Sequence, residues 1–303
     1  MIKKAFETTE KKTYAALIYG QTGVGKSTLA CSADNSVVID FDNGLDRVPI
    51  LHRRDYTAGG SWEQMVADTR EAAMTYDTII VDTVGKMIEL IESDIITNNP
   101  QLRDKKGGLS LKGFAMRKNM FSSYIKDCKT AGVNLIFVAQ ETETDEDGRK
   151  IRRPAIGSDK MATELLQDLD LAGYVHVVNG RRVIEWGTVD YAWTKNSCGL
   201  PQSMQLPDLA KEPNELMVRV AEQFKSYQTA KVETSQRYVA MKEQIDERLE
   251  KVQSCEELTE AMRELAELPD ILGSRTYAKQ AVKDMAATLS CKWDKGQGAF
   301  VAK

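Results

Sequence analysis

Residues 13–30 read TYAALIYGQTGVGKSTLA, and this stretch decides the fold. An apolar run ends at Gly20, a loop follows, and Lys26, Ser27 and Thr28 open a helix that we expect to reach about residue 33. The spacing from Gly20 to Ser27 is G-x-x-x-x-G-K-S, in which glycines let successive backbone N–H groups turn inward toward phosphate oxygens. The start of the helix adds further unpaired N–H groups. The alternative is a strand-to-helix turn that needs glycines for its shape alone.

The motif gives each position a role in a nucleotide site. We expect Lys26 to reach the β- and γ-phosphates of ATP, and the Ser27 hydroxyl to bind Mg²⁺, because hard cations prefer oxygen ligands. Residues 77–83 read DTIIVDT, which predicts a Walker B strand that brings Asp82 to the metal. The alternative for Asp82 is a helix-capping residue after an ordinary strand. The predicted nucleotide-binding residues are Gly20, Gln21, Thr22, Gly23, Val24, Gly25, Lys26, Ser27 and Thr28, with Ser27 and Asp82 as metal ligands.

Composition excludes several classes of protein. Hydrophobic residues make up 42% of the 303 residues, which is too many for a disordered chain. The net charge is -4, so any nucleic-acid binding has to come from local patches. The five cysteines form no C-x-x-C pair, which favours reduced thiols in a cytoplasmic protein over disulfides or zinc. No apolar run has the length of a membrane span, and the N-terminus lacks the apolar segment of a secretory signal.

Alternating strand and helix patterns predict an α/β fold for the first part of the chain. We expect a mostly parallel sheet between helices, followed by an antiparallel hairpin at Asn179-Gly180. From about residue 227 the sequence becomes rich in Glu and Lys with helical periodicity, which predicts an all-α appendage. The predicted domains are a core, 1–225, and a helical C-terminal domain, 226–303. Expected elements include a third hairpin strand at 189–193 and helices at 215–224, 229–252, 254–268 and 274–289.

Hydrolysis of ATP by water also needs a group that orients the water. The strand at 36–41 is followed by an acidic turn, which places Asp40 and Asp42 at the edge of the sheet where ligands bind. Either could act as the base. Gln140 ends the strand at 133–139 and could hydrogen-bond the γ-phosphate. The alternatives are a turn-forming role for Asp42 and a plain polar strand end at Gln140.

The P-loop followed by VIDFDNGLD at 38–46 resembles the RecA superfamily. That resemblance implies that Asp42 is the catalytic base, although the family usually has the longer glutamate there. It also implies that Gln140 couples the nucleotide to a mobile DNA-binding loop. Lys195-Asn196-Ser197-Cys198-Gly199 is similar to the KNRFG motif of RadA-type proteins, whose lysine acts on the nucleotide of a neighbouring subunit. Only Lys195, Asn196 and Gly199 carry over, and the alternative for Lys195 is a solvated loop residue.

Residues 13–201 as a whole look like a phage-type, minimal RecA-like ATPase of the single-strand annealing and recombination group, and the likeness does not cover 226–303. It implies single-stranded DNA and further copies of the chain, in a ring or a filament, as partners. A single-strand DNA-binding protein is another candidate partner. Two basic segments are candidates for DNA contact, and the alternative is that both are solvated charged loops. They are Arg103, Lys105, Lys106 and Lys112 in the first, and Arg149, Lys150, Arg152 and Arg153 in the second, within a stretch, 141–160, that we expect to be a long mobile loop.

Three functions are therefore open. The first is a DNA-stimulated ATPase that binds single-stranded DNA and promotes annealing or strand exchange as an oligomer, with Lys26, Asp42, Gln140 and Lys195 as catalytic residues. The second is a helicase-like or remodelling NTPase that acts on a protein partner through its C-terminal helices. The third is a nucleotide-dependent switch with negligible turnover, which the short side chain of Asp42 would favour.

Overall fold

The computed structural model describes residues 10–57, 59–146, 148–209 and 212–303. The chain divides into two compact units: a core unit, Lys11–Ser226, and a C-terminal unit that contains Tyr227–Lys303. Within the described residues, no helix combines the length and the low charge that a membrane crossing requires.

The core unit alternates strands and helices along most of its length. Its strands are β1 (Ala15–Gly20), β2 (Ser36–Asp40), β3 (Asp55–Tyr56), β4 (Thr78–Asp82), β5 (Asn134–Glu146), β6 (Arg149–Pro154), β7 (Leu171–Val178), β8 (Arg181–Glu185), β9 (Lys195–Asn196) and β10 (Ser203–Gln205). Its helices are α1 (Lys26–Ala30), α2 (Trp62–Ala72), α3 (Val84–Asn98), α4 (Leu111–Ala131), α5 (Asp159–Asp168) and the first part of α6 (Leu216–Glu250).

These strands form one sheet with the P-loop strand near its middle. The order along its main path is β10-β8-β7-β1-β5-β4-β2-β3, with β6 paired to β5 and β9 paired to β7. β1 pairs in parallel with both β5 and β7, and all six of its residues are buried. A strand that is covered on both faces has to be apolar throughout, which explains the sequence AALIYG. The prediction of a mostly parallel α/β sheet is confirmed.

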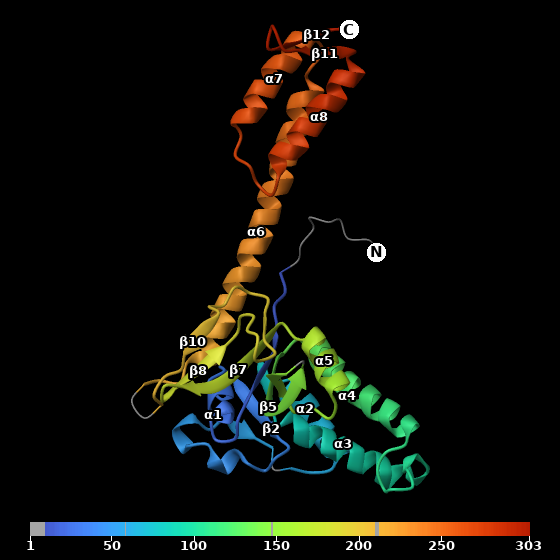
Figure 1. The fold of residues 1–303 in the computed structure, drawn as a ribbon, viewed down its shortest axis with the longest axis vertical. Helices are drawn as coiled ribbons and strands as arrows, with labels where there is room; N and C mark the ends of the chain where they lie inside the picture. Colours follow the sequence, from blue (N-terminus) through green and yellow to red (C-terminus); the bar gives the residue numbers. More distant parts are fainter. Residues whose placement is uncertain (1–9, 58, 147, 210–211) are drawn as a thin grey trace. The chain divides into compact units, whose positions relative to one another are not determined.

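Helices cover both faces of this sheet (Figure 1). Leu17 and Tyr19 of β1 pack in the same cluster as the buried residues of α2, α3, α4 and α5. Ile18 points to the other face, where it packs with α1 and the start of α6. The end of β1, from which the P-loop leaves, is therefore fixed from both sides.

The predicted antiparallel hairpin is confirmed at Asn179-Gly180. β7 and β8 pair on either side of it, from Val178 opposite Arg181 to Tyr174 opposite Glu185. Asn179 and Gly180 have φ values of 51° and 77°, the left-handed conformations that a two-residue type I′ turn requires.

The expected long mobile loop at 141–160 is wrong. β5 continues through it, and β6 returns antiparallel to β5, so that Glu143 faces Arg152 and Asp145 faces Lys150. Opposite charges across a strand pair stabilise a ribbon that lacks an apolar face. The segment has no apolar periodicity because three of its six facing pairs join opposite charges and the others each contain a polar residue.

Other boundaries also differ from the sequence expectation. The third hairpin strand expected at 189–193 is wrong: Ala192 makes only an isolated bridge to Arg152, and the next strand is β9. The two helices expected at 215–224 and 229–252 are one continuous helix, α6. No proline or glycine interrupts residues 216–250, so nothing local ends the first helix.

The C-terminal unit contains the rest of α6, α7 (Cys255–Glu267), α8 (Ser274–Thr288) and a hairpin of β11 (Cys291–Asp294) and β12 (Ala299–Ala302). The helices share an apolar cluster that includes Leu249, Leu258 and Val282. The Ser254 side chain caps α7 by accepting a hydrogen bond of 3.2 Å from the backbone N–H of Glu257. The β11–β12 hairpin is absent from the sequence prediction, so this unit is not all-α.

The expectation that all five cysteines are free thiols is wrong for two of them. Cys255 and Cys291 form a disulfide between the start of α7 and β11, with their Cα atoms 5.9 Å apart. They are 36 residues apart in the sequence, and only the antiparallel packing of α7 against α8 brings them together. Cys31, Cys128 and Cys198 are free and buried, as expected for structural thiols.

Candidate nucleotide-binding site

The loop between β1 and α1 holds the residues predicted to bind phosphate, and two glycines fix its path. A Cβ atom on Gly20 would lie 2.1 Å from the carbonyl oxygen of Val175 in the neighbouring β7, so only glycine fits there. Gly25 caps α1 with a φ of 91°, in the left-handed region that favours glycine. α1 is five residues long and ends at Ala30, short of the expected residue 33. Its dipole is correspondingly small, so loop N–H groups and Lys26 have to supply most of the attraction for phosphate.

Lys26 is buried in this loop and is held by neutral groups. Its ammonium donates to the Gln21 carbonyl oxygen at 2.7 Å and to Gln140 Oε1 at 3.1 Å. The Thr22 hydroxyl donates to the same Gln140 oxygen at 3.0 Å. Burial lowers the pKa of Lys26, while the nearby carboxylates of Asp82 and Glu141 act in the opposite direction. A buried cation whose hydrogen-bond partners are neutral is suited to receive an anion.

Ser27 and Asp82, the predicted metal ligands, lie together at the ends of α1 and β4. Asp82 is buried, and the Ser27 hydroxyl hydrogen-bonds to its carboxylate. Burial raises the pKa of Asp82 to about 6, and the nearby carboxylates of Asp40 and Asp42 act in the same direction, whereas Ser27 and Lys26 lower it. A bound cation would relieve the cost of this buried charge, so these oxygen donors fit Mg²⁺.

The structure separates the two candidate bases. Both oxygens of Asp40 accept hydrogen bonds from backbone N–H groups, of Asp42 and Gly44 at 3.2 Å and of Leu45 at 3.0 Å. Asp40 is buried and serves to fold the turn after β2. Asp42 lines the cavity next to the P-loop, and its Oδ2 atom is 3.2 Å from Nη1 of Arg47. Of the two acids, Asp42 is the one that a nucleotide in this cavity could meet.

The cavity at the P-loop has a volume of about 310 Å³. This is within the range of small-molecule sites in proteins. In the described part of the chain, no group of three His, Cys, Asp or Glu side chains could hold a metal ion by itself. A magnesium ion here would therefore take its remaining ligands from phosphate oxygens and water, as Mg²⁺ commonly does. The predicted residues that line the cavity are Thr22, Gly23, Gly25, Lys26, Ser27, Thr28, Asp42, Asp82 and Gln140.

Two arginines that the sequence analysis does not identify also lie at this loop. Arg47 lines the cavity beside Asp42. Arg182 of β8 reaches the outer side of the P-loop, where a Cβ atom on Gly25 would lie 2.8 Å from its Nη1 atom. Arg182 donates to the Pro207 carbonyl oxygen at 3.3 Å and forms no ion pair with a described carboxylate. Its charge is therefore uncompensated beside the loop, and it is not among the residues that line the cavity.

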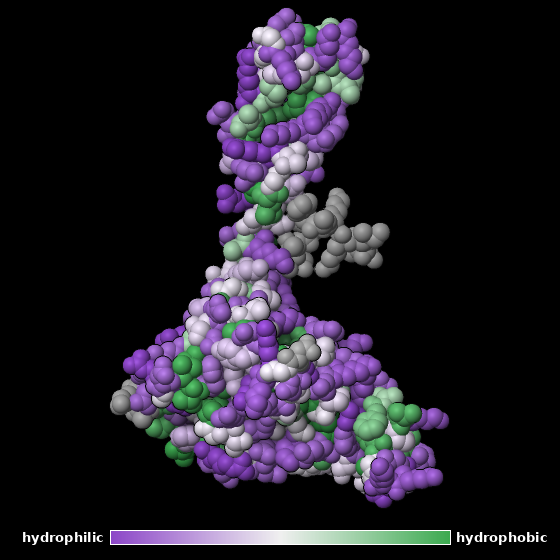
Figure 2. Space-filling model, viewed as in Figure 1, coloured by the Kyte–Doolittle hydropathy of each residue, from purple (hydrophilic) through white to green (hydrophobic). Residues whose placement is uncertain are grey.

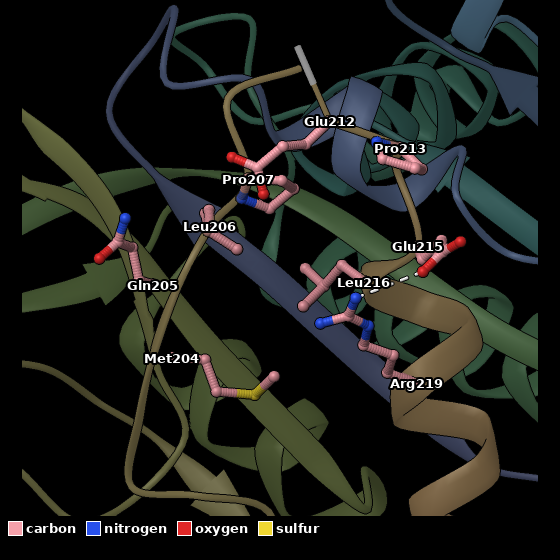
Figure 3. A pocket seen from close by; sticks show the side chains of 9 residues that line it. All are labelled: Met204, Gln205, Leu206, Pro207, Glu212, Pro213, Glu215, Leu216 and Arg219. Atoms are coloured by element: carbon pink, nitrogen blue, oxygen red, sulfur yellow. Dashed lines mark hydrogen bonds and ion pairs between the residues drawn. The ribbon is translucent and has the colours of Figure 1, made fainter.

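A second cavity of about 170 Å³ lies between the end of β10 and the start of α6 (Figure 3). Leu206 and Leu216 line its apolar side, and an ion pair of 3.3 Å joins Glu215 to Arg219 at its edge. The segment before α6 is attached to α1, because the Asn214 amide donates to the Thr28 carbonyl oxygen at 2.5 Å. The start of α6 thus supports the P-loop helix from outside.

The two predicted DNA-binding segments differ in how many of their cations form ion pairs. Arg149 of the hairpin is exposed and forms no ion pair with a described residue, whereas the other predicted cations of the hairpin are paired. In the hairpin, Lys150 is 2.8 Å from Glu143, and Arg152 also pairs with Glu143. Arg153 is buried, pairs with Glu146 and Asp159, and stacks on Trp193. In the turn between α3 and α4 and at the start of α4, by contrast, the cations are exposed and form no ion pair with any described residue. These are Arg103, Lys105, Lys106 and Lys112.

Lys195 lies away from the P-loop cavity of its own chain. β9 pairs with the first residues of β7, where Lys195 faces Ala172. The Lys195 ammonium donates to the carbonyl oxygens of Leu166 and Gln167, at 2.8 and 3.0 Å, in the last turn of α5. The Asn196 side chain closes the following turn by accepting from the Leu200 N–H at 3.1 Å. In the single chain, this motif holds α5 and the turn after β9 in place.

A comparison with protein-family models matches residues 12–198 to a family described as an AAA domain. The match contains the P-loop, the strand that ends in Asp82, Gln140 and Lys195. No curated protein matches the chain.

Proposed function

Because the chain belongs to the AAA domain family, we propose that its P-loop binds ATP with Mg²⁺ and hydrolyses it to drive work on single-stranded DNA. Domains of this family are P-loop ATPases, so nucleotide hydrolysis in general follows from membership. The observation that carries the finer proposal is the group of exposed cations at the turn between α3 and α4, which form no ion pair with a described residue. Sensing of the nucleotide is supported by the contact of Gln140 with both Lys26 and Thr22, which joins the phosphate loop to the strand that continues into the β5–β6 hairpin.

The proposed chemistry assigns one task to each side chain. Lys26 and the loop N–H groups hold the β- and γ-phosphates, and Ser27 and Asp82 hold Mg²⁺, which supplies positive charge to the phosphates when it is bound. Asp42 orients the attacking water. Arg182 adds a cation on the outer side of the loop, where it neutralises phosphate charge.

Gln140 is the proposed sensor of the γ-phosphate. Its Oε1 atom accepts from the Lys26 ammonium, which is the group that a γ-phosphate would claim. Phosphate binding would therefore release Gln140 from Lys26. Gln140 and Glu141 are consecutive residues of β5, which forms one strand of the hairpin. A change in the hydrogen bond of Gln140 can therefore be passed directly to the hairpin along this strand.

We place the DNA contact at the turn between α3 and α4 and not at the hairpin. Arg103, Lys105, Lys106 and Lys112 have unpaired charges that are free to meet phosphates. Figure 2 shows hydrophobic residues on the surface where α3 turns into α4. Leu111 is 88% exposed there and Phe114 is 44% exposed, which offers bases an apolar and aromatic face.

The proposal includes oligomers in which Lys195 acts on the nucleotide of a neighbouring chain. A trans role for Lys195 requires its ammonium to leave the α5 carbonyls and reach a neighbouring chain. The test is sedimentation velocity of the wild-type chain with and without an ATP analogue. Nucleotide-dependent assembly that Lys195→Met abolishes supports the trans role, and assembly that the variant leaves unchanged removes it.

The main test is the release of phosphate from ATP with and without a single-stranded oligonucleotide. We expect turnover that the oligonucleotide stimulates, and we expect Lys26→Ala to abolish it. For the DNA surface, the double variant Lys105→Glu with Lys106→Glu is compared with Lys126→Glu with Lys160→Glu, which reverses two exposed charges outside the turn. Only the first pair is expected to lose oligonucleotide binding at low salt and to flatten its dependence on salt.

The other two functions predict different results. Phosphate release that Lys26→Ala leaves unchanged would favour a nucleotide switch with negligible turnover, which the pairing of Asp42 with Arg47 could support. Turnover that responds to a protein and not to an oligonucleotide would favour a remodelling NTPase.

A further inference from the structure

The C-terminal unit has a groove of about 400 Å³ between α7 and α8. Its floor is apolar and is formed by Met262 and Leu265 of α7 with Ala278 and Val282 of α8. Leu265, Ala278 and Val282 are almost fully buried, at 5%, 6% and 5% exposure, so the floor is a fixed part of the core. Figure 2 shows hydrophobic residues between these two helices with hydrophilic residues along both sides.

The rim of this groove is cationic. Arg263, Arg275 and Lys279 line it, all three are exposed, and no carboxylate is among the lining residues. None of the three forms an ion pair within the described part of the chain: Arg263 donates to the Gly298 carbonyl oxygen at 3.3 Å, and Arg275 donates to that of Leu268 at 3.2 Å.

The absence of carboxylates is a local property of the groove lining. Residues 227–303 contain 13 acidic and 12 basic side chains, so the unit as a whole carries almost no net charge. The Asp270 carboxylate accepts from the backbone N–H of Arg275 and not from its guanidinium. Three cations thus surround an apolar floor, and no carboxylate of the described residues forms an ion pair with them.

We propose that the groove binds an acidic peptide segment of a partner protein, with apolar side chains on the floor and carboxylates against the three cations. Charge complementarity selects an acidic ligand, and the apolar floor selects a peptide over a nucleic acid. A nucleic acid would need aromatic side chains for its bases to stack on, and the lining has none. The floor is preformed, because Leu265, Ala278 and Val282 belong to the buried apolar cluster of the unit. The proposal is independent of the ATPase function.

The test uses the full chain and a fluorescein-labelled decapeptide in which aspartate and glutamate alternate with leucine and phenylalanine. A second decapeptide with lysine in place of each acid, and a labelled single-stranded oligonucleotide, are titrated in parallel. The binding variant is Arg275→Glu with Lys279→Glu. The matched control is Lys283→Glu with Lys292→Glu, which reverses two exposed charges of the same unit outside the groove. Circular dichroism checks that both variants keep their helices.

We expect the acidic decapeptide to bind the wild-type chain and the control with dissociation constants within about threefold of each other, and the groove variant to bind at least about tenfold more weakly. The lysine decapeptide is expected not to bind. Equal binding by both variants, or no binding of the acidic decapeptide to the wild-type chain, would overturn the proposal. So would an oligonucleotide or self-association signal that the groove variant abolishes, because each would assign the groove to a different occupant.

Discussion

Replacing Asp82 by asparagine is predicted to stabilise the folded, metal-free chain. The pKa of Asp82 is raised from 3.8 to about 6, mainly by burial, so the folded state binds this proton more tightly than the unfolded state does. The corresponding stability is fully present below pH 3.8 and is lost as the pH rises through about 6. At neutral pH the ionised Asp82 therefore destabilises the fold, by about 3 kcal/mol for a difference of about 2 pH units.

An asparagine side chain at this position would have nearly the same shape, could still accept the Ser27 hydrogen bond and would carry no charge. We therefore expect Asp82→Asn to raise the free energy of unfolding by up to about 3 kcal/mol at pH 7.5. At pH 5 the wild-type Asp82 is mostly protonated, and the advantage of the variant shrinks by about 1.4 kcal/mol. The gain at neutral pH comes with a loss of metal binding, since a neutral amide is a poorer ligand for Mg²⁺ than a carboxylate.

The assay is urea unfolding in EDTA without nucleotide, at pH 7.5 and pH 5, followed by tryptophan fluorescence. Asp46→Asn is the control, because the Asp46 side chain is 82% exposed and removal of its charge should change stability little at either pH. The reasoning holds that the ionised Asp82 destabilises the metal-free fold. An Asp82→Asn variant that is less stable than the wild type at pH 7.5, or whose gain in the free energy of unfolding does not depend on pH, would refute it.

Three further predictions concern the P-loop, its neighbour Arg182 and the lysine of β9. Arg182→Ala is expected to weaken ATP binding about tenfold in a fluorescence titration, whereas Arg181→Ala, which removes an exposed neighbouring cation, should change it less than about twofold. Gly20→Ala places a Cβ atom 2.1 Å from the Val175 oxygen, so we expect a loss of several kcal/mol in urea unfolding, and a normal midpoint would contradict that contact. Lys195→Ala should cost about 1 kcal/mol of stability through the lost hydrogen bonds to α5, and an unchanged midpoint would show that those bonds are not formed in solution.

The nucleotide loop could be predicted from the sequence because its signals are local. The motif, the strand before it and the acid that ends β4 each depend on neighbouring residues, and the structure brings Lys26, Ser27, Asp82 and Gln140 to one cavity. The role of Asp40, by contrast, depends on hydrogen bonds that the sequence does not show. Asp40 and Asp42 look alike in the sequence. Only the structure shows that the Asp40 carboxylate already accepts hydrogen bonds from backbone N–H groups.

The misassigned parts depend on contacts between distant segments. Arg182 reaches Gly25 only because the sheet places β8 beside β7, which in turn pairs with β1. The hairpin of β5 and β6 depends on pairs of opposite charge across the two strands, such as Glu143 with Arg152. Such pairs leave no alternation of apolar and polar residues from which a strand could be predicted. The disulfide likewise requires α7 and α8 to pack side by side, which spacing alone does not indicate.

The measurement that tests the central claim most directly is calorimetric titration of ATP into the wild-type chain with and without Mg²⁺, repeated with Lys26→Ala and Ser27→Ala. We expect tight binding only with Mg²⁺ in the wild type. Ser27→Ala should lose the difference that Mg²⁺ makes, and Lys26→Ala should weaken binding at least about tenfold under both conditions. Equal affinities for all three proteins, or wild-type binding that is indifferent to Mg²⁺, would contradict a magnesium-dependent nucleotide site at the P-loop.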